Sequence, residues 1–256
     1  MDTHTQSNRN VFGAVIFLKD GCLLNAEDLL SDFHRRWEGI VLVSEGEKAN
    51  CLYFRGGDFH FAIEFRDWPV PRRIVRGILD HTLHRSRDEK LLEEHNNHFG
   101  AVASRDRGRL LDLACVFTKL IVSVLSVTGA LAICWLQGSL LCPAQDFIEV
   151  TESMLRIGSP PLMLWINLEW KPKGHLVHST GMAQFQAPEL FLARQSGISK
   201  ETAEYFFDLA YYIVGSGQEI LDGDTLDGPE GVLKVESMKM GKSGKRGLFL
   251  VPVRPN

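Results

Sequence analysis

The sequence predicts an α+β fold in which helices pack on mixed, largely antiparallel sheets. Apolar runs of strand length alternate with segments that carry apolar residues at helical spacing. Several strand candidates are joined by turns of hairpin length, which antiparallel strands use and parallel strands cannot. The chain has 256 residues, of which 45% are hydrophobic, so it can bury a large core without disulfides or metals.

The first part of the chain is predicted to form a strand, a helix, a short strand and a hairpin. Residues 11–18 are continuously apolar, as expected for a buried central strand. Asn25 is placed to cap the helix that follows it. Residues 40–43 form a short strand candidate. Two alternating segments, 51–54 and 59–65, flank a Gly-Gly turn and so predict a hairpin.

The middle of the chain is predicted to contain a charged helical segment and then a strand–helix–strand unit. Residues 72–94 combine high charge with helix-forming composition. Strands are expected at 99–103 and 130–136. Between them lies a long apolar helix at 110–127, which is expected to end at Gly129. This helix is interpreted as a buried core helix rather than a membrane span, because polar residues and a glycine interrupt the apolar run.

The last part of the chain is predicted to contain two helices and two pairs of strands. A helix after Pro143 ends at the Gly-Ser-Pro-Pro break at 158–161. Ser199 is placed to cap the second helix, and an acidic loop is expected at 222–230. Strands are expected at 162–170, 176–185, 232–238 and 248–253, with a short piece at 190–193.

These elements suggest two lobes. We expect a disordered tail at 1–10, an N-terminal α+β lobe at 11–136 and a C-terminal α+β lobe at 137–256. An open alternative is that the two lobes are similar α/β units. The tetrapeptide at 12–15 recurs at 99–102 and fits a repeated unit, although four residues also recur by chance.

Composition favours a cytoplasmic protein with a protein partner. The formal net charge of -4 argues against non-specific nucleic-acid binding and mildly favours a basic partner. The five cysteines are odd in number and include no C-x-x-C pair, which suits a reducing compartment. The polar N-terminus has no apolar core typical of a secretory signal. Neither nucleic acid nor a membrane is expected as a partner.

The motifs with potential chemistry are weak. The pairs His81/His84 and His95/His98 have helical spacing and could bind zinc, but solvated histidines are the favoured explanation. The acidic loop lacks the oxygen ligands of an EF-hand at the required positions. The Gly-Lys-Ser triplet before the last strand lacks the upstream glycine of a phosphate loop. We therefore expect no catalytic residue, no metal and no cofactor.

The most informative stretch is the box at 181–190, which reads Gly-Met-Ala-Gln-Phe-Gln-Ala-Pro-Glu-Leu. Gly181 is expected to permit a bend or a close backbone approach. Met182 and Phe185 are expected to be core residues. Pro188 restricts the following strand to a sheet edge or a strand start.

This box and its neighbours resemble a bacterial domain-of-unknown-function family, number 4261. The resemblance rests on 178–185, on 188–190 including Glu189, and on Leu-Asp-Gly-Asp-Thr at 221–225. It also includes His98 before an apolar strand, the helix–Gly129–strand passage that ends at Trp135, and the apolar residues 164–166. The match spans roughly residue 95 to the C-terminus, with looser agreement before that. The resemblance implies a cytosolic bacterial α+β protein with no established enzymatic activity. It also implies a setting among interbacterial toxin and secretion genes, in which small acidic proteins neutralise toxins.

The first hypothesis is therefore a non-enzymatic immunity protein that binds and neutralises a cognate toxin effector. A type VI secretion system is the leading setting and a nuclease the leading toxin, because carboxylates can occupy its basic groove. The candidate partner-binding carboxylates are Asp222, Asp224, Asp227 and Glu230, with Glu149 and Glu152 behind them.

Two alternatives remain open. The chain could be an enzyme that gathers His175, His178, Glu189 and either Asp222 or Asp224 around a cleft. It could also be an adaptor that loads an effector. Separately, Trp165 and Trp170 lie five residues apart on one predicted strand, so they are expected to point to opposite faces, one of them toward an interface.

Overall fold

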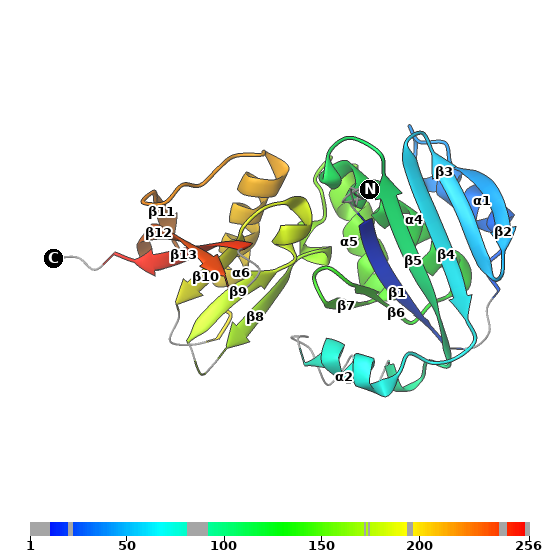
Figure 1. Ribbon diagram of the computed structural model, residues 1–256, viewed down its shortest axis with the longest axis horizontal. Coiled ribbons are helices and arrows are strands. Elements are labelled where there is room, and N and C mark those ends of the chain that lie inside the picture. The colour runs from blue at the N-terminus through cyan, green and yellow to red at the C-terminus, as the bar shows by residue number, and fades with distance from the viewer. Residues whose placement is uncertain are drawn as a thin grey trace, which may run out of the picture.

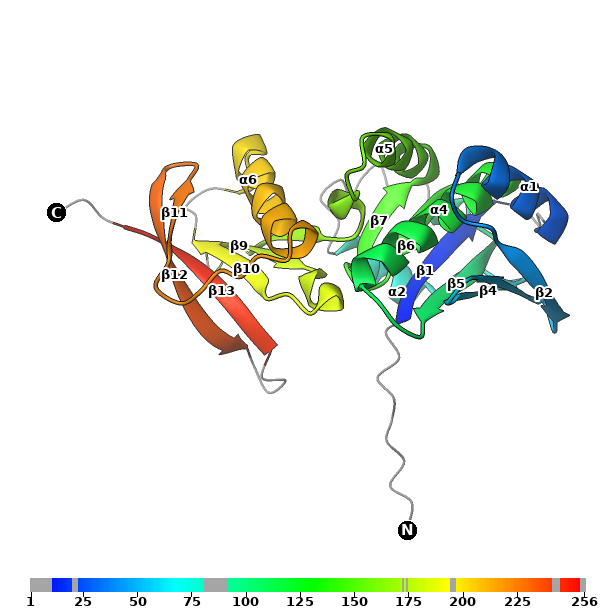
Figure 2. The ribbon, with the colours of Figure 1, turned by 90° about the horizontal axis from the view of Figure 1, so that it is seen from above.

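The computed structural model describes residues 11–19, 23–80, 92–171, 173, 175–193, 197–240 and 245–253. The predicted tail at 1–10 lies outside the described residues. The described elements form two largely antiparallel sheets with helices packed on them, which confirms the predicted α+β class (Figure 1). The sheets lie side by side, and most of the helices cover the same side of both (Figure 2).

The first sheet, sheet A, has seven strands in the order β2-β3-β4-β5-β1-β6-β7, and every neighbouring pair is antiparallel. Its strands are β1 (Val11–Leu18), β2 (Val43–Lys48), β3 (Cys51–Gly56), β4 (Phe59–Arg66), β5 (Asn97–Arg105), β6 (Ala132–Trp135) and β7 (Leu140–Pro143). One face is covered by α1 (Ala26–Arg36), α4 (Leu110–Thr128) and α5 (Ala144–Arg156). Part of the other face is covered by α2 (Arg72–Leu79).

The burial pattern explains why β1 is central and α4 is a core helix. In β1, Ile16 packs into the main core while Phe17 packs under α2 on the opposite face, so both faces are buried. Within the described residues, α4 is the one helix long and apolar enough to cross a bilayer. Eleven of its nineteen residues are buried against neighbouring elements, as the sequence predicts. It ends at Gly129, whose φ of 59° is left-handed, as expected for a C-cap.

The second sheet, sheet B, has six strands in the order β11-β12-β13-β10-β9-β8. Its strands are β8 (Asn167–Lys171), β9 (Leu176–Thr180), β10 (Glu189–Ala193), β11 (Thr225–Gly228), β12 (Gly231–Met240) and β13 (Lys245–Pro252). Strands β10 and β13 are parallel, and the other neighbours are antiparallel. One face is covered by α6 (Lys200–Ala210), which is capped by the Ser199 hydroxyl and continues into a π-helical turn, Tyr211–Gly215.

The structure corrects several predicted strands. The strand predicted at 40–43 overlaps β2 at one residue only, because β2 starts at Val43. The segment 162–170 begins with a 3-10 turn, Leu162–Leu164, because the preceding prolines bring the chain in as a turn. Trp165 therefore precedes β8, and it does not share a strand with Trp170.

Two further corrections concern the box and the acidic loop. The predicted strand 176–185 stops at Thr180, because Gly181 has a φ of 118° and leads into a 3-10 turn, Met182–Phe185. The acidic loop at 222–230 contains a strand, β11, which pairs with β12. Both β11 and the unpredicted β7 are four residues long, too short for a periodicity signal.

The two sheets share one continuous cluster of buried hydrophobic residues, which runs from Phe12 in sheet A to Leu250 in sheet B. Sheet A includes β7 and is covered by α5, both of which follow residue 136. The sheets differ in strand order, and the echo segments 12–15 and 99–102 lie antiparallel to each other within sheet A.

Candidate functional site

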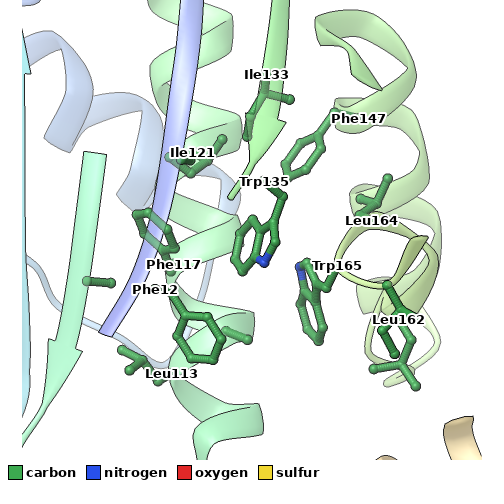
Figure 3. Close-up of a cluster of buried hydrophobic side chains, with 14 of the residues drawn as sticks. Phe12, Leu113, Phe117, Ile121, Ile133, Trp135, Phe147, Leu162, Leu164 and Trp165 are labelled. Carbon is green, nitrogen blue, oxygen red and sulfur yellow. The ribbon is translucent and has the colours of Figure 1, made fainter. Parts of the chain in front are cut away.

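The box joins the two sheets through a cluster of aromatic side chains. Trp135 of β6 and Trp165, which lies between the 3-10 turn and β8, stack with ring centroids 5.9 Å apart, and Figure 3 shows the two indole rings side by side. Phe185 of the box lies 5.7 Å from the Trp165 ring and 5.9 Å from the ring of Phe12 in β1. Phe117 of α4 closes the cluster against Trp135 at 5.3 Å. The joint between the sheets is therefore a packed aromatic cluster.

Gln184 links the backbone of the box to both tryptophans. Its Nε2 donates hydrogen bonds to the carbonyls of Trp165, at 2.9 Å, and Gly181, at 2.6 Å. Its Oε1 accepts a hydrogen bond from Trp135 Nε1 at 2.8 Å. Three of the polar groups at the joint are thus satisfied by one side chain. Nothing in the local sequence indicates this role, because Gln184 is one of three polar residues in the box.

The carboxylate of Glu189 stabilises the turn of the box by accepting hydrogen bonds. Its Oε1 accepts from the backbone N–H groups of Gly181 and Ala183, both at 3.0 Å. Its Oε2 accepts from the Ser179 hydroxyl at 2.6 Å, and that hydroxyl accepts in turn from the Leu190 N–H at 2.9 Å. Charge-assisted bonds of this kind are about twice as strong as neutral ones. Glu189 therefore acts as a fold-holding carboxylate.

Two glycines allow the chain segments to approach each other at the joint. A Cβ on Gly181 would lie 2.6 Å from the Trp165 carbonyl oxygen, and a Cβ on Gly138 would lie 2.3 Å from the same oxygen. Contacts below 3.0 Å essentially never occur for real Cβ atoms. The close approach expected at Gly181 is present, and the segments that approach it are the Trp165 backbone and Gly138 in the β6–β7 turn of the other sheet.

Two cavities flank the end of the box. One, of about 380 Å³, is lined by Ala183, by residues 185–189, by Ile213 and Ile220, and by Arg246. The other, of about 240 Å³, is lined by Phe185, Gln186 and residues 108–111. A larger cavity of about 880 Å³ lies elsewhere, between the ends of α4 and α5 and the Arg36 side chain. The cavities near the box are at or below the small end of ligand pockets.

His178 lies on the face of sheet B opposite α6, in an aromatic row. Its ring stacks on Phe191 with centroids 5.6 Å apart, and Phe191 stacks on Phe249 at 4.6 Å. His178 Nε2 lies 3.7 Å from Glu169 Oε2. Burial lowers the pKa of His178 below its ordinary 6.5, although the Glu169 carboxylate opposes this.

This lowered pKa predicts acid sensitivity. The unfolded chain takes up a proton at the ordinary pKa of 6.5, while the folded chain holds His178 neutral to lower pH. Stability from this burial is therefore complete above pH 6.5 and is lost as the pH falls from there toward the folded pKa. We expect His178→Phe to reduce this loss, as measured by urea unfolding at several pH values. An equal dependence of stability on pH in His178→Phe and in the parent would contradict the assignment.

The structure separates the six candidate carboxylates into two groups. Asp222 Oδ1 accepts from the Ser237 N–H at 2.6 Å, and Asp224 Oδ2 accepts from the Leu221 N–H at 2.8 Å, so both hold the turn before β11. Asp227 in β11 and Glu230 in the following turn are exposed.

Glu149 and Glu152 lie on α5, which packs on sheet A. Glu149 accepts from Gln145, and Glu152 pairs with Arg36. They do not lie behind the acidic turn, because α5 packs on sheet A while the acidic turn lies at the far edge of sheet B (Figure 1).

The residues of the enzyme alternative are not gathered around a cleft. Glu189 is bonded within the box and Asp222 within the acidic turn. His175 lies in the turn before β9, with its ring 6.3 Å from that of Trp170. His178 lies beside Glu169, in the aromatic row described above.

The histidine pairs have separate structural surroundings. His95 is buried, its Nε2 accepts from the Val70 N–H at 2.9 Å, and its Nδ1 contacts the Leu92 carbonyl. His98 Nδ1 lies 2.9 Å from the Trp68 carbonyl. His81 and His84 lie outside the described residues. Among the residues that are described, no group of three or more metal-binding side chains is found.

Comparison with known proteins identifies part of the chain. Neither a curated protein nor a solved structure matches it. A family model, described as Domain of unknown function (DUF4261), matches residues 178–244. The matched residues begin at His178 and include the box, α6 and the acidic turn, so they carry the resemblance noted from the sequence. The segment 178–244, which contains β10, β11 and β12 of sheet B, is therefore similar to the DUF4261 family.

Proposed function

We propose that this chain is a non-enzymatic binding protein, an immunity protein that binds and neutralises a cognate toxin in the cytoplasm. One observation carries the proposal: the acidic turn and β11 form an exposed edge of sheet B, at the end of the molecule remote from sheet A (Figure 1). An edge strand offers unpaired backbone groups to a partner strand. Exposed carboxylates beside that edge attract a basic surface.

The polar groups of the box support the same proposal. The carboxylate of Glu189 and the amide of Gln184 are engaged in hydrogen bonds that hold the turn and the joint. These residues are better explained by fold than by chemistry. The secretion-system setting and the nuclease activity of the toxin are the finer parts of the proposal, and they rest on the family resemblance.

The direct test is co-expression of the full chain with the protein encoded by the neighbouring gene. If the proposal is right, the two proteins co-purify and the chain restores growth to cells that express the toxin. Failure of both co-purification and rescue would reject the immunity role.

A matched pair of variants tests the surface. We expect Asp227→Asn with Glu230→Gln to weaken toxin binding roughly tenfold, because exposed ion pairs contribute up to about 1 kcal/mol each. The control, Glu149→Gln with Glu152→Gln, removes the same charge from α5 and should leave the affinity unchanged. Both are measured by calorimetry at low and high salt. A larger loss in the α5 variant would place the interface on sheet A instead.

A further inference from the structure

The helix α2 carries arginines at its N-terminal end, where the helix dipole disfavours positive charge. Arg72 and Arg73 lie in its first turn, and that turn contains no acidic residue. The N-terminal end of a helix is positively polarised, so a cation there costs roughly 0.3–1 kcal/mol. The local stability of α2 therefore does not explain these arginines.

The inner side of α2 is firmly packed, which fixes the direction of its outer side. Ile78 and Leu79 are buried against Phe17 of β1 and Cys134 of β6. The Pro71 carbonyl accepts the first backbone bonds of the helix, from the N–H groups of residues 74 and 75. The opposite side of α2 is consequently held toward solvent.

That outer side combines three guanidinium groups with exposed apolar side chains. Arg72, Arg73 and Arg76 are exposed, and none of the ion pairs found among the described residues involves them. Ile74, between them, is 48% exposed, and the nearby Trp68 is 50% exposed. We call these five residues the basic rim.

Contacts with His98 and Arg66 fix Trp68 in its exposed position. Its carbonyl contacts His98 Nδ1 at 2.9 Å, and its ring meets the His98 ring edge-on. The Arg66 guanidinium lies 5.3 Å from the centre of the Trp68 ring, and Arg66 is itself paired with Glu64. A positioned tryptophan beside arginines and an exposed isoleucine is the combination that the interface of a lipid bilayer accommodates.

The position of α2 suits contact with a plane. The helix lies along the lower rim of the molecule in Figure 1, below the ends of the strands of sheet A. We propose that the basic rim is a peripheral docking surface for anionic membranes. Lipid phosphates would neutralise the arginines, and the headgroup region would take up Ile74 and the Trp68 ring. This partner goes beyond the proposed function, and the composition of the whole chain does not indicate it.

The lipid surface is favoured over nucleic acid as the partner. Nucleic-acid binding draws its affinity from many phosphate contacts, and three arginines supply few of them. Burial of Ile74 and Trp68 adds to binding at a lipid surface, whereas an exposed isoleucine adds nothing along a phosphate backbone.

Flotation of the full chain with vesicles tests the proposal. We expect binding to phosphatidylcholine vesicles that contain about a quarter phosphatidylglycerol, no binding to phosphatidylcholine alone, and weakening by salt. Replacing Arg72, Arg73 and Arg76 by Gln should weaken partitioning about a hundredfold, or about fivefold for each arginine. The control, Lys48→Gln with Lys234→Gln and Lys239→Gln, removes the same charge from exposed positions on both sheets and should bind as the parent does.

A second measurement reports the apolar contact. Brominated lipids should quench part of the tryptophan fluorescence of the parent, and Trp68→Phe should abolish that part. Trp68 is the exposed tryptophan, whereas Trp135 and Trp165 are buried, and Trp37 and Trp170 are half-buried outside the basic rim. The proposal is overturned if the parent does not bind anionic vesicles, if both charge variants lose binding equally, or if a DNA duplex binds the rim while vesicles do not. Circular dichroism of each variant confirms that it is folded.

Discussion

Replacing Gly138 by alanine is expected to destabilise the protein by about 3 kcal/mol, at the upper end of the usual cost of overpacking. The added Cβ would lie 2.3 Å from the Trp165 carbonyl oxygen and 3.5 Å from that of Thr180. Both neighbours are backbone atoms, so no change of rotamer can relieve the contact. The turn of sheet A and the box of sheet B would have to separate.

Thermal unfolding followed by circular dichroism measures this effect, with an expected fall in Tm of roughly 6–12 °C for a chain of this size. Gly181→Ala should also be destabilising, since its φ of 118° disfavours any side chain and its Cβ meets the same carbonyl. The control is Gly100→Ala in β5, where a Cβ meets nothing within 4 Å. A Gly138→Ala protein as stable as the Gly100→Ala protein would show that the joint is looser than described.

Replacing Trp165 by alanine is expected to cost about 4 kcal/mol of unfolding free energy, within the range for buried tryptophans. Its side chain is completely buried between Trp135 of sheet A and Phe185 of the box. Its Nε1 also donates to the Thr118 hydroxyl of α4 at 2.8 Å. The variant loses both the ring contacts and this hydrogen bond, and it leaves a cavity at the joint.

Urea unfolding measures this cost, and two variants separate its components. Trp165→Phe keeps most of the ring volume and loses the hydrogen bond, so it should cost less than Trp165→Ala. Trp68→Ala removes a tryptophan that is half exposed and should change stability by less than about 1 kcal/mol. Equal losses at Trp165 and Trp68 would contradict the role of Trp165 in the joint.

The elements that sequence reasoning identified correctly share a strong local signal. The apolar run of β1, the Asn25 and Ser199 caps, the Gly129 C-cap and the hairpin of β3 and β4 each depend on residues close together in the chain. The errors occur where local signals are weak or conflict. Residues 162–166 are apolar because they enter the core, and the buried 3-10 turn at 162–164 gives the same apolar pattern as the start of a strand.

The site was predicted less completely than the fold. The sequence singled out the box and indicated a fold role for Gly181, Met182 and Phe185. It gave no sign that Gln184 contacts Trp135, because 49 residues separate them. Nor did it show that Glu189 accepts three hydrogen bonds, or that α5 carries Glu149 and Glu152 away from the acidic turn.

By itself, the sequence determined the class of the fold, the capped helices, the buried long helix and the family to which the segment around the box is similar. These follow from periodicity, capping and short motifs, which act over a few residues. Only the tertiary structure decided that the box is the joint between two sheets. It also decided that the acidic turn borders an edge strand and that the arginines of α2 face solvent on a rim. These depend on which distant segments pack together, and that choice is made by the burial of the whole core.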